Sequence, residues 1–371
     1  MKSIFKISII ILIIAGLSIV GYLAWIYLVA PRITPSEETA LPGEAQPAIP
    51  NVPVPLTANK VFDYWINKKT KEVHYLDENG QIYKITKEGE QVLSSQNIAG
   101  LNHIKPNGDG TLVLVGFGYP ATPTFAIFNT LTKSWQAMPA NTTSAAWSPS
   151  APTGGPRLAY LRNGRLYLLT LADQKSKEII KIDQKDLELE WVLPDVVYLK
   201  ERPSIQLASS IWSININTKE VRSLAKPESG LLVRWFGDSK TGIKFTNSLS
   251  KENLLQIVNL DNQPLGSVGL ITLPSKCAFN ALGTALYCAA TKTEISGVSL
   301  PDDYLKRAVY FQDDIYQLSL IDLGGQLIGL PTKILDTESV KIVIDADQLE
   351  VNSKQLLFIN RYDKKLYSLA L

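Results

Sequence analysis

The side chains that could carry chemistry are few in this chain of 371 residues. It contains two cysteines, Cys277 and Cys288, and two histidines, His74 and His103. Acidic residues gather in short loops, namely Asp77-Glu78-Asn79-Gly80, Asn107-Gly108-Asp109-Gly110, Asp302-Asp303, Asp313-Asp314, and Asp345 with Asp347. Thiols could form a disulfide, hold a metal or act as nucleophiles, and carboxylates could bind Ca²⁺ or work as an acid–base pair.

None of these residues stands in a recognisable catalytic or metal-binding motif. The sequence lacks G-x-S-x-G, H-E-x-x-H, a P-loop and G-x-G-x-x-G. The acidic loops lack EF-hand spacing, and Asn or Asp beside Gly is what β-turns require. Asp313 and Asp314 would point to opposite faces of a strand. We therefore predict no catalytic, cofactor-binding or metal-binding residue and expect no cofactor.

The two cysteines have the spacing of partners in a β-hairpin. If Ala281–Thr284 form a four-residue loop, Cys277 lies opposite Cys288. Opposed positions that share no hydrogen bond have Cα atoms about 4.5 Å apart, near the lower end of the disulfide range. We predict a disulfide, with two buried reduced thiols as the alternative; a metal-binding or catalytic thiol is disfavoured.

The elements that would position these residues follow a regular repeat. The residues His103, Trp147, Trp191, Trp235 and Phe279 are spaced 44 residues apart. Each is expected to end the first strand of a four-stranded unit and to pack between strands. A period of 40–45 residues is typical of a β-propeller with one blade per repeat. His103 stands where other units have tryptophan, so we expect it to pack in its blade.

The repeat predicts seven blades, although six are possible if the unit that starts near Val61 is only an outer strand and a hairpin. In the last unit we expect Leu349 to occupy the position that corresponds to Trp147 and its equivalents. In the sixth unit we expect Gln326–Leu330 to be the fourth strand. An insertion, Thr291–Arg307, interrupts that unit. The last unit has room for three strands, so Asn51–Thr57 is expected to supply the fourth; Pro53 and Pro55 fit an edge strand.

Residues 7–30 carry no charge and are long enough to cross a bilayer. A cleaved signal peptide is the competing interpretation, but its apolar region would be shorter and would end in a small-x-small site. Lys2 and Lys6 before the span predict a cytoplasmic N-terminus of residues 1–6, a bias that Arg32 weakens. Residues 31–57 are proline-rich and read as an extended linker. Residues 58–371 are then the propeller domain.

One unit resembles a known repeat. Ala145-Ala146-Trp147-Ser148-Pro149, followed by Leu158–Leu161 and Arg165–Leu169, resembles the W-S-P-D-G-K-x-L-A-Y repeat of TolB-like and WD40-like bacterial propellers. Residues 150–156 replace the usual D-G turn with a longer loop. The unit from Asp345 to Leu369 looks like the closing blade of uncharacterised membrane-anchored propellers of this kind. The resemblance implies a periplasmic or cell-surface setting and a recognition role, and it supplies no catalytic residues.

These observations together predict an all-β protein on a single transmembrane helix, with its propeller outside the cytoplasmic membrane. A net charge of +2 without a basic stripe argues against nucleic-acid binding. We expect a non-catalytic module that binds an envelope protein or polysaccharide. The alternative is a propeller-type hydrolase or lyase acting on an envelope glycan or lactone; apolar inner strands would disfavour it. The insertion carries the candidate interaction residues Leu300, Pro301, Asp302, Asp303 and Tyr304.

Overall fold

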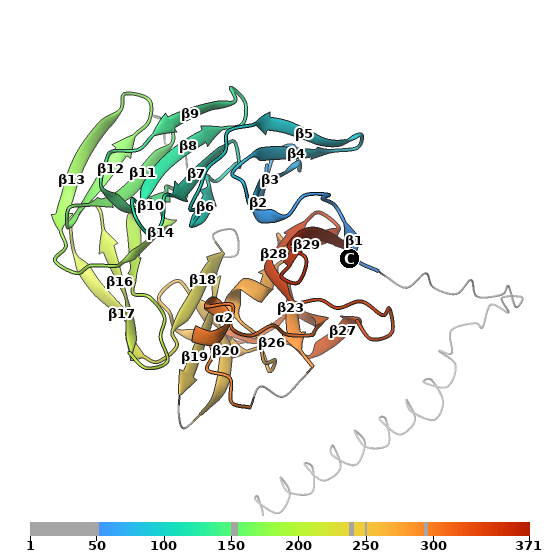
Figure 1. Cartoon of the computed structure of the whole chain (residues 1–371). Coiled ribbons are helices and arrows are strands. Elements are labelled where there is room, and N and C mark those ends of the chain that lie inside the picture. Colours follow the sequence, from blue (N-terminus) through green and yellow to red (C-terminus); the bar gives the residue numbers. More distant parts are fainter. Residues whose placement is uncertain (1–51, 150–154, 237–240, 249–250, 293–295) are drawn as a thin grey trace, which may run out of the picture. The chain divides into compact units, whose positions relative to one another are not determined.

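The chain forms a seven-bladed β-propeller (Figure 1). The structure, a computed structural model, describes residues 52–371 except 150–154, 237–240, 249–250 and 293–295. Within these residues, seven antiparallel sheets of four strands follow one another around a ring, and one further sheet has two strands. The six-bladed alternative is therefore wrong, because the first unit is a complete blade.

Blades 1 to 5 each use four consecutive strands, with the first strand innermost. Blade 1 contains β2 (Val61–Ile66), β3 (Val73–Asp77), β4 (Ile82–Thr86) and β5 (Gly89–Ser94). Blade 2 contains β6 (His103–Pro106), β7 (Leu112–Phe117), β8 (Thr124–Asn129) and β9 (Ser134–Ala137). Blade 3 contains β10 (Thr142–Trp147), β11 (Arg157–Arg162), β12 (Arg165–Thr170) and β13 (Lys175–Lys181). Blade 4 contains β14 (Glu188–Leu193), β15 (Val196–Lys200), β16 (Ser209–Asn215) and β17 (Val221–Glu228).

Blade 5 contains β18 (Leu232–Phe236), β19 (Thr241–Ser248), β20 (Lys251–Asn259) and β21 (Pro264–Ser267). Blade 6 contains β22 (Cys277–Phe279), β23 (Ala285–Thr291), β24 (Asp313–Ser319) and β27 (Pro331–Leu335). Blade 7 contains β28 (Ala346–Asn352), β29 (Gln355–Asn360), β30 (Lys365–Ala370) and, from the other end of the propeller sequence, β1 (Val54–Pro55).

The hydrophobic core lies between blades rather than within one blade. Seven clusters of buried side chains occur among the described residues, one at each junction of neighbouring blades. The cluster that joins blade 7 to blade 1 includes Leu357 and Ile359 together with Val61 and Tyr75. Each sheet is thus apolar on both faces, and the ring closes because every blade buries both faces against a neighbour.

The closing strand comes from the N-terminal side, as predicted. In β1, Val54 pairs with Ser368 and Pro55 with Tyr367 at the outer edge of blade 7. The amide of Leu56 continues the ladder by donating to the Leu366 carbonyl at 2.8 Å. Proline is tolerated here because only one side of an edge strand is paired.

The 44-residue repeat places four of its five residues correctly. Trp147, Trp191, Trp235 and Phe279 are buried at corresponding positions, each opposite the second residue of the next strand. The prediction for His103 as the end of a strand is wrong, because His103 begins β6 and the corresponding position is Pro106. The first two repeats are shorter: the corresponding residues Trp65, Pro106 and Trp147 are 41 residues apart.

Two further register predictions need correction. In blade 7 the corresponding residue is Val351, which pairs with Leu356, and not Leu349, because a bulge shifts the register of β28. In blade 6 the fourth strand is β27 and not Gln326–Leu330. Residues Gln326–Ile328 form β26, which pairs with β25 (Ile321–Leu323) in a separate hairpin around Gly324 and Gly325. An alternating apolar run predicts a strand but does not identify its partner.

No helix within the described residues is long and apolar enough to cross a membrane. The predicted transmembrane segment, residues 7–30, lies outside the described residues. Residues 31–51 of the predicted linker also lie outside them.

Candidate functional site

The inner strands surround a central channel that is lined by charged side chains. In blade 2, the Lys105 ammonium donates to Glu188 Oε1 at 3.0 Å and to the Leu189 carbonyl at 2.8 Å, both in blade 4. Because this contact passes the intervening blade 3, the groups meet in the interior of the ring. The inner strands are mostly apolar, as expected, but the side chains that they turn toward the channel include these charged groups. Strand residues alternate in direction, so Trp191 packs between blades while its neighbour Glu190 turns the other way.

These channel carboxylates are paired with lysines. Lys200 lies 2.6 Å from Glu190 and 3.7 Å from Glu188, and Lys105 completes the group. Burial would raise the pKa of Glu188, but Lys105 and Lys200 lower that pKa by more. Burial likewise lowers the pKa of Lys200, and the two glutamates raise it by more. Glu188 and Lys200 are therefore charged at neutral pH, which suits binding of polar groups better than proton transfer.

A hollow of about 290 Å³ opens where the inner strands end. Its lining combines aromatic side chains at repeat positions with cations and amides, including Lys68, Lys71, Arg234, Trp235, Phe279 and Asn352. The Arg234 guanidinium is held by a hydrogen bond of 3.1 Å to the Cys277 carbonyl and lies 4.9 Å above the Phe236 ring. This arginine is thereby oriented before any ligand arrives.

A second hollow, of about 190 Å³, lies where several inner strands begin. Asp63, His103 and Asp347 line it together with Arg307, Tyr310 and Arg361. Burial raises the pKa of Asp63 to about 7, with the charges of Glu350 and Asp347 adding to the effect and the Tyr64 amide opposing it. Asp347 Oδ1 is buried and has no hydrogen-bond partner among the described residues. This hollow therefore contains two carboxylates, and burial raises the pKa of one of them, Asp63.

A buried network of four charged residues lies beside the second hollow and was not predicted. The Lys276 ammonium contacts Asp313 Oδ2 at 2.6 Å and Asp345 Oδ1 at 2.7 Å, and Arg361 reaches Asp345 Oδ2 at 2.8 Å. Lys276 belongs to a 3₁₀ turn, Pro274–Lys276, and the two acids come from blades 6 and 7. Motif searches miss this network because its members are 37 and 69 residues from the lysine.

The neighbouring acid Asp314 belongs to a different group, as strand alternation predicts. Asp314 contacts Lys333 at 2.7 Å and Lys292 at 3.0 Å, on the face opposite to Asp313. The acidic loop at Asp77 acts locally, since Asp77 Oδ1 accepts hydrogen bonds from the amides of Asn79 and Gln81. Within the described residues, no group of three or more histidine, cysteine and acidic residues is arranged to hold a metal ion.

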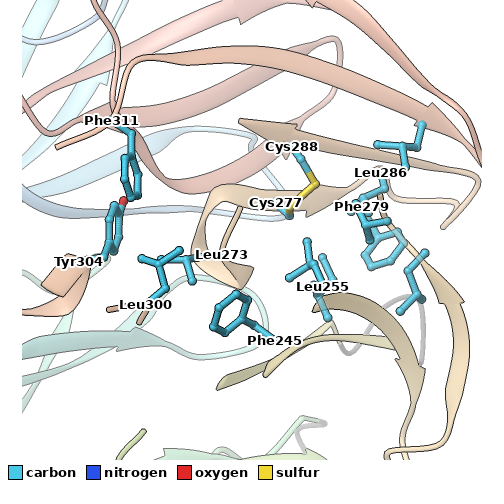
Figure 2. Packing of buried hydrophobic residues seen from close by; sticks show 14 residues of the cluster. Phe245, Leu255, Leu273, Cys277, Phe279, Leu286, Cys288, Leu300, Tyr304 and Phe311 are labelled. Atoms are coloured by element: carbon cyan, nitrogen blue, oxygen red, sulfur yellow. A yellow bond between two sulfur atoms is a disulfide. The ribbon is translucent and has the colours of Figure 1, made fainter. Parts of the chain in front are cut away.

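The insertion of blade 6 is folded onto the propeller. Leu300 and Tyr304, the latter in the short helix α2 (Asp302–Leu305), are buried, and Figure 2 shows the Tyr304 ring against Phe311. Asp302 Oδ2 accepts a hydrogen bond from the Ile205 amide of blade 4, and the Leu300 carbonyl accepts one from Asn247 of blade 5. Arg361 of blade 7 lies 3.8 Å above the Tyr304 ring.

The insertion therefore ties together loops of blades 4, 5 and 7. Pro301 is buried and Asp303 is partly buried, with Asp303 Oδ2 accepting from the Ser299 amide. Any partner of this loop would meet the exposed residues 305–308 rather than Leu300 or Tyr304.

The two cysteines form a disulfide (Figure 2), with the predicted register and a Cα–Cα distance of 4.2 Å. Both are fully buried in the cluster between blades 5 and 6. His74 also packs, as its ring stacks on Trp65 at 5.5 Å; His103 lies 5.4 Å from Phe125. Burial lowers the pKa of each histidine to about 4. Both rings are thus neutral packing groups at physiological pH.

No protein-family model and no curated protein matches this sequence. Similar solved structures include an oligogalacturonate lyase in complex with manganese, with 12% identity over 86% of this chain and 93% of the lyase and a TM-score of 0.56. The WD40 repeats of RRP9 match with 10% identity over 86% of this chain and 97% of that chain, with a TM-score of 0.55. TolB from Acinetobacter baumannii matches at 13% identity over 72% of this chain and 62% of TolB, with a TM-score of 0.44.

The resemblance to WD40-like propellers is thus confirmed as a likeness in fold. The similar structures include a lyase and a WD40 protein, and identities this low reveal architecture alone. Propellers host many unrelated activities, so the function has to be argued from the site.

Proposed function

We propose that this chain is a single-pass membrane protein that holds a seven-bladed propeller outside the cytoplasmic membrane, where the propeller binds an envelope protein or polysaccharide without chemical catalysis. The uncharged segment 7–30 supports the anchor, and Lys2 and Lys6 support a cytoplasmic N-terminus. The disulfide between Cys277 and Cys288 supports an oxidising compartment.

The observation that carries the binding role is the hollow at the end of the inner strands. It is concave, and it combines aromatic surface from Trp235 and Phe279 with cations and amides, as ligand sites commonly do. Arg234 is held in place by the protein itself, so binding would cost little ordering of this side chain. The channel carboxylate of Glu188 supports recognition over catalysis, because Lys105 and Lys200 lower its pKa and keep it charged.

A photo-cross-linking amino acid placed in the full-length chain in cells tests this proposal. At Lys71, which lines the hollow, we expect one abundant adduct with an envelope protein or with cell-wall glycan. The matched control is Lys177, an exposed lysine of β13 in blade 3, where no such adduct should form. Equal adduct patterns at the two positions would contradict a binding site at this hollow.

The alternative function, cleavage of an envelope glycan or lactone, is favoured by the second hollow. There Asp63, with a pKa of about 7, lies in a hollow that Asp347 also lines, and glycosidases commonly use two carboxylates. The full-length protein in detergent would be incubated with cell-wall polysaccharides and assayed for new reducing ends. Product formation that Asp63→Asn abolishes while the melting temperature is unchanged would establish this alternative and reject the non-catalytic role.

A further inference from the structure

The hairpin of β25 and β26 is an addition to blade 6. In the other blades that follow sequence order, a short turn joins the third strand to the fourth, as between Asn129 and Ser134 in blade 2. In blade 6, residues 320–330 separate β24 from β27 and form this hairpin. The blade would be complete without it, so the hairpin is not needed to build the sheet.

One face of the hairpin seats it on the propeller. Asp322 pairs with Leu327 across the two strands, and Leu327 packs against the core cluster between blades 5 and 6. The backbone of Leu327 lies directly on β21, where a Cβ atom added to Gly266 would come within 2.1 Å of the Leu327 carbonyl oxygen. The hairpin therefore has a defined orientation on the outer rim of the ring.

The opposite face is apolar and open to solvent. Ile321 pairs with Ile328, and Leu323, which pairs with Gln326, falls on the same face by strand alternation; Leu330 follows two residues after the end of β26. The exposed fractions are 61% for Ile321, 61% for Leu323, 49% for Ile328 and 84% for Leu330. Isolated exposed aliphatic residues are common, but three on one face, with a fourth just beyond the strand, form a patch that marks an interaction site.

We propose that this apolar face rests in the headgroup–acyl boundary of the membrane to which the chain is anchored. The inference rests on the proposed function, specifically on the anchor at residues 7–30. About 23 residues separate that segment from β1, and the chain enters the ring through β1 at the outer edge of blade 7. The hairpin belongs to the neighbouring blade 6, where it leans away from blade 7 and toward blade 5.

The anchor raises the effective concentration of the hairpin at the membrane surface. Four aliphatic side chains bind a bilayer weakly when the protein is free in solution, because binding strength scales with the apolar area buried. A tether of this length keeps the propeller within about 80 Å of the lipid surface, at roughly 3.1–3.6 Å per residue. The effective concentration is then high enough for a weak contact to be occupied. The hairpin would fix which side of the propeller faces the membrane.

Depth-dependent fluorescence quenching tests the proposal in the full-length chain, reconstituted into phosphatidylcholine–phosphatidylglycerol vesicles. A nitrobenzoxadiazole label is attached to Leu323→Cys; the native cysteines are oxidised and buried and do not react. The matched control is Leu131→Cys, which is 74% exposed in the turn between β8 and β9 of blade 2. Lipids with nitroxide groups near the headgroup should quench the label at position 323 several-fold more than the label at position 131.

Each other result would overturn the inference. Equal quenching at the two positions would show that the hairpin does not touch lipid. Energy transfer between labels at position 323 without lipid quenching would show that a second copy of the chain covers the face. An alkaline carbonate wash distinguishes failure of the anchor from failure of the hairpin contact. Release of the chain refutes the anchor, whereas a retained chain without quenching refutes only the contact between hairpin and lipid.

Discussion

At the scale of single residues, the charged side chains are organised by burial and by partners far away in sequence. Asp313 and Asp345 would pass for turn residues in a sequence scan, yet both are fully buried around the Lys276 ammonium. The ammonium also lies 5.1 Å from the Tyr304 ring and 5.0 Å from the Phe311 ring. The network thus joins blades 6 and 7 to the insertion.

Replacing Lys276 should be strongly destabilising. Lys276→Met leaves Asp313 and Asp345 buried with fewer cations, and the loss of one partner from a buried ion pair costs about 3–5 kcal/mol. Urea unfolding measures the change in free energy. The control is Lys181→Met, because Lys181 pairs with Asp183 at 2.7 Å with both side chains exposed, and its loss should cost less than about 1 kcal/mol. Equal losses would show that the buried network contributes no more than a surface pair.

The buried histidines make stability depend on pH. Burial lowers the pKa of His74 in the folded protein to about 4, below its ordinary value of 6.5. Between these values the unfolded chain binds more protons, so the stability is fully present above pH 6.5 and is lost as the pH falls toward 4. From this residue alone we expect a loss of about 2 kcal/mol between pH 7 and pH 5.

His74→Phe isolates that contribution, because phenylalanine keeps an aromatic ring against Trp65 and does not titrate. Urea unfolding at pH 7 and pH 5 should show a pH-dependent loss about 2 kcal/mol smaller in the variant. His103, whose pKa is also lowered to about 4, remains as the internal reference in both proteins. An identical loss in the two proteins would mean that His74 is hydrated in the fold.

At the scale of elements, local patterns predict strands well and partners less well. The pairing of Cys277 with Cys288 follows from a tight hairpin turn, whose loop length fixes the register. β26 reads as the fourth strand of blade 6 because it is apolar and follows a glycine turn, but it pairs with β25 instead. The difference arises because hydrogen bonding between strands depends on how the intervening turn folds back.

The closing strand β1 gives a prediction at this scale. Deletion of residues 50–58 removes the pairing of β1 with β30 and the Thr57 hydroxyl that accepts from the Leu366 amide. The outer edge of blade 7 would then be open, and the melting temperature should fall by several degrees in calorimetry. A deletion of equal length in the linker, residues 40–48, is the control and should leave the melting temperature unchanged. An equal melting temperature for both deletions would show that closure by β1 adds no stability.

At the scale of the whole molecule, the ring creates features that no single blade has. Seven inter-blade clusters close it, and its channel brings Lys105 of blade 2 to Glu188 of blade 4. The ring also separates three surfaces where a partner could bind: the two hollows around the inner strands and the apolar hairpin on the rim. Because the comparisons identify the fold alone, these surfaces are where experiments on function should begin.

The sequence by itself determined the propeller, the insertion after Thr291, the disulfide and the closing strand, because each depends on local alternation, turn chemistry or chain length. Tertiary structure decided the rest. The true repeat position of blade 2, Pro106, depends on pairing with Val113, and a fixed 44-residue step lands at His103. The channel charges, the Lys276 network and the exposed face of the hairpin are visible only in three dimensions. The reason is that loop lengths vary and that side chains far apart in sequence are brought together by the packing of distant strands.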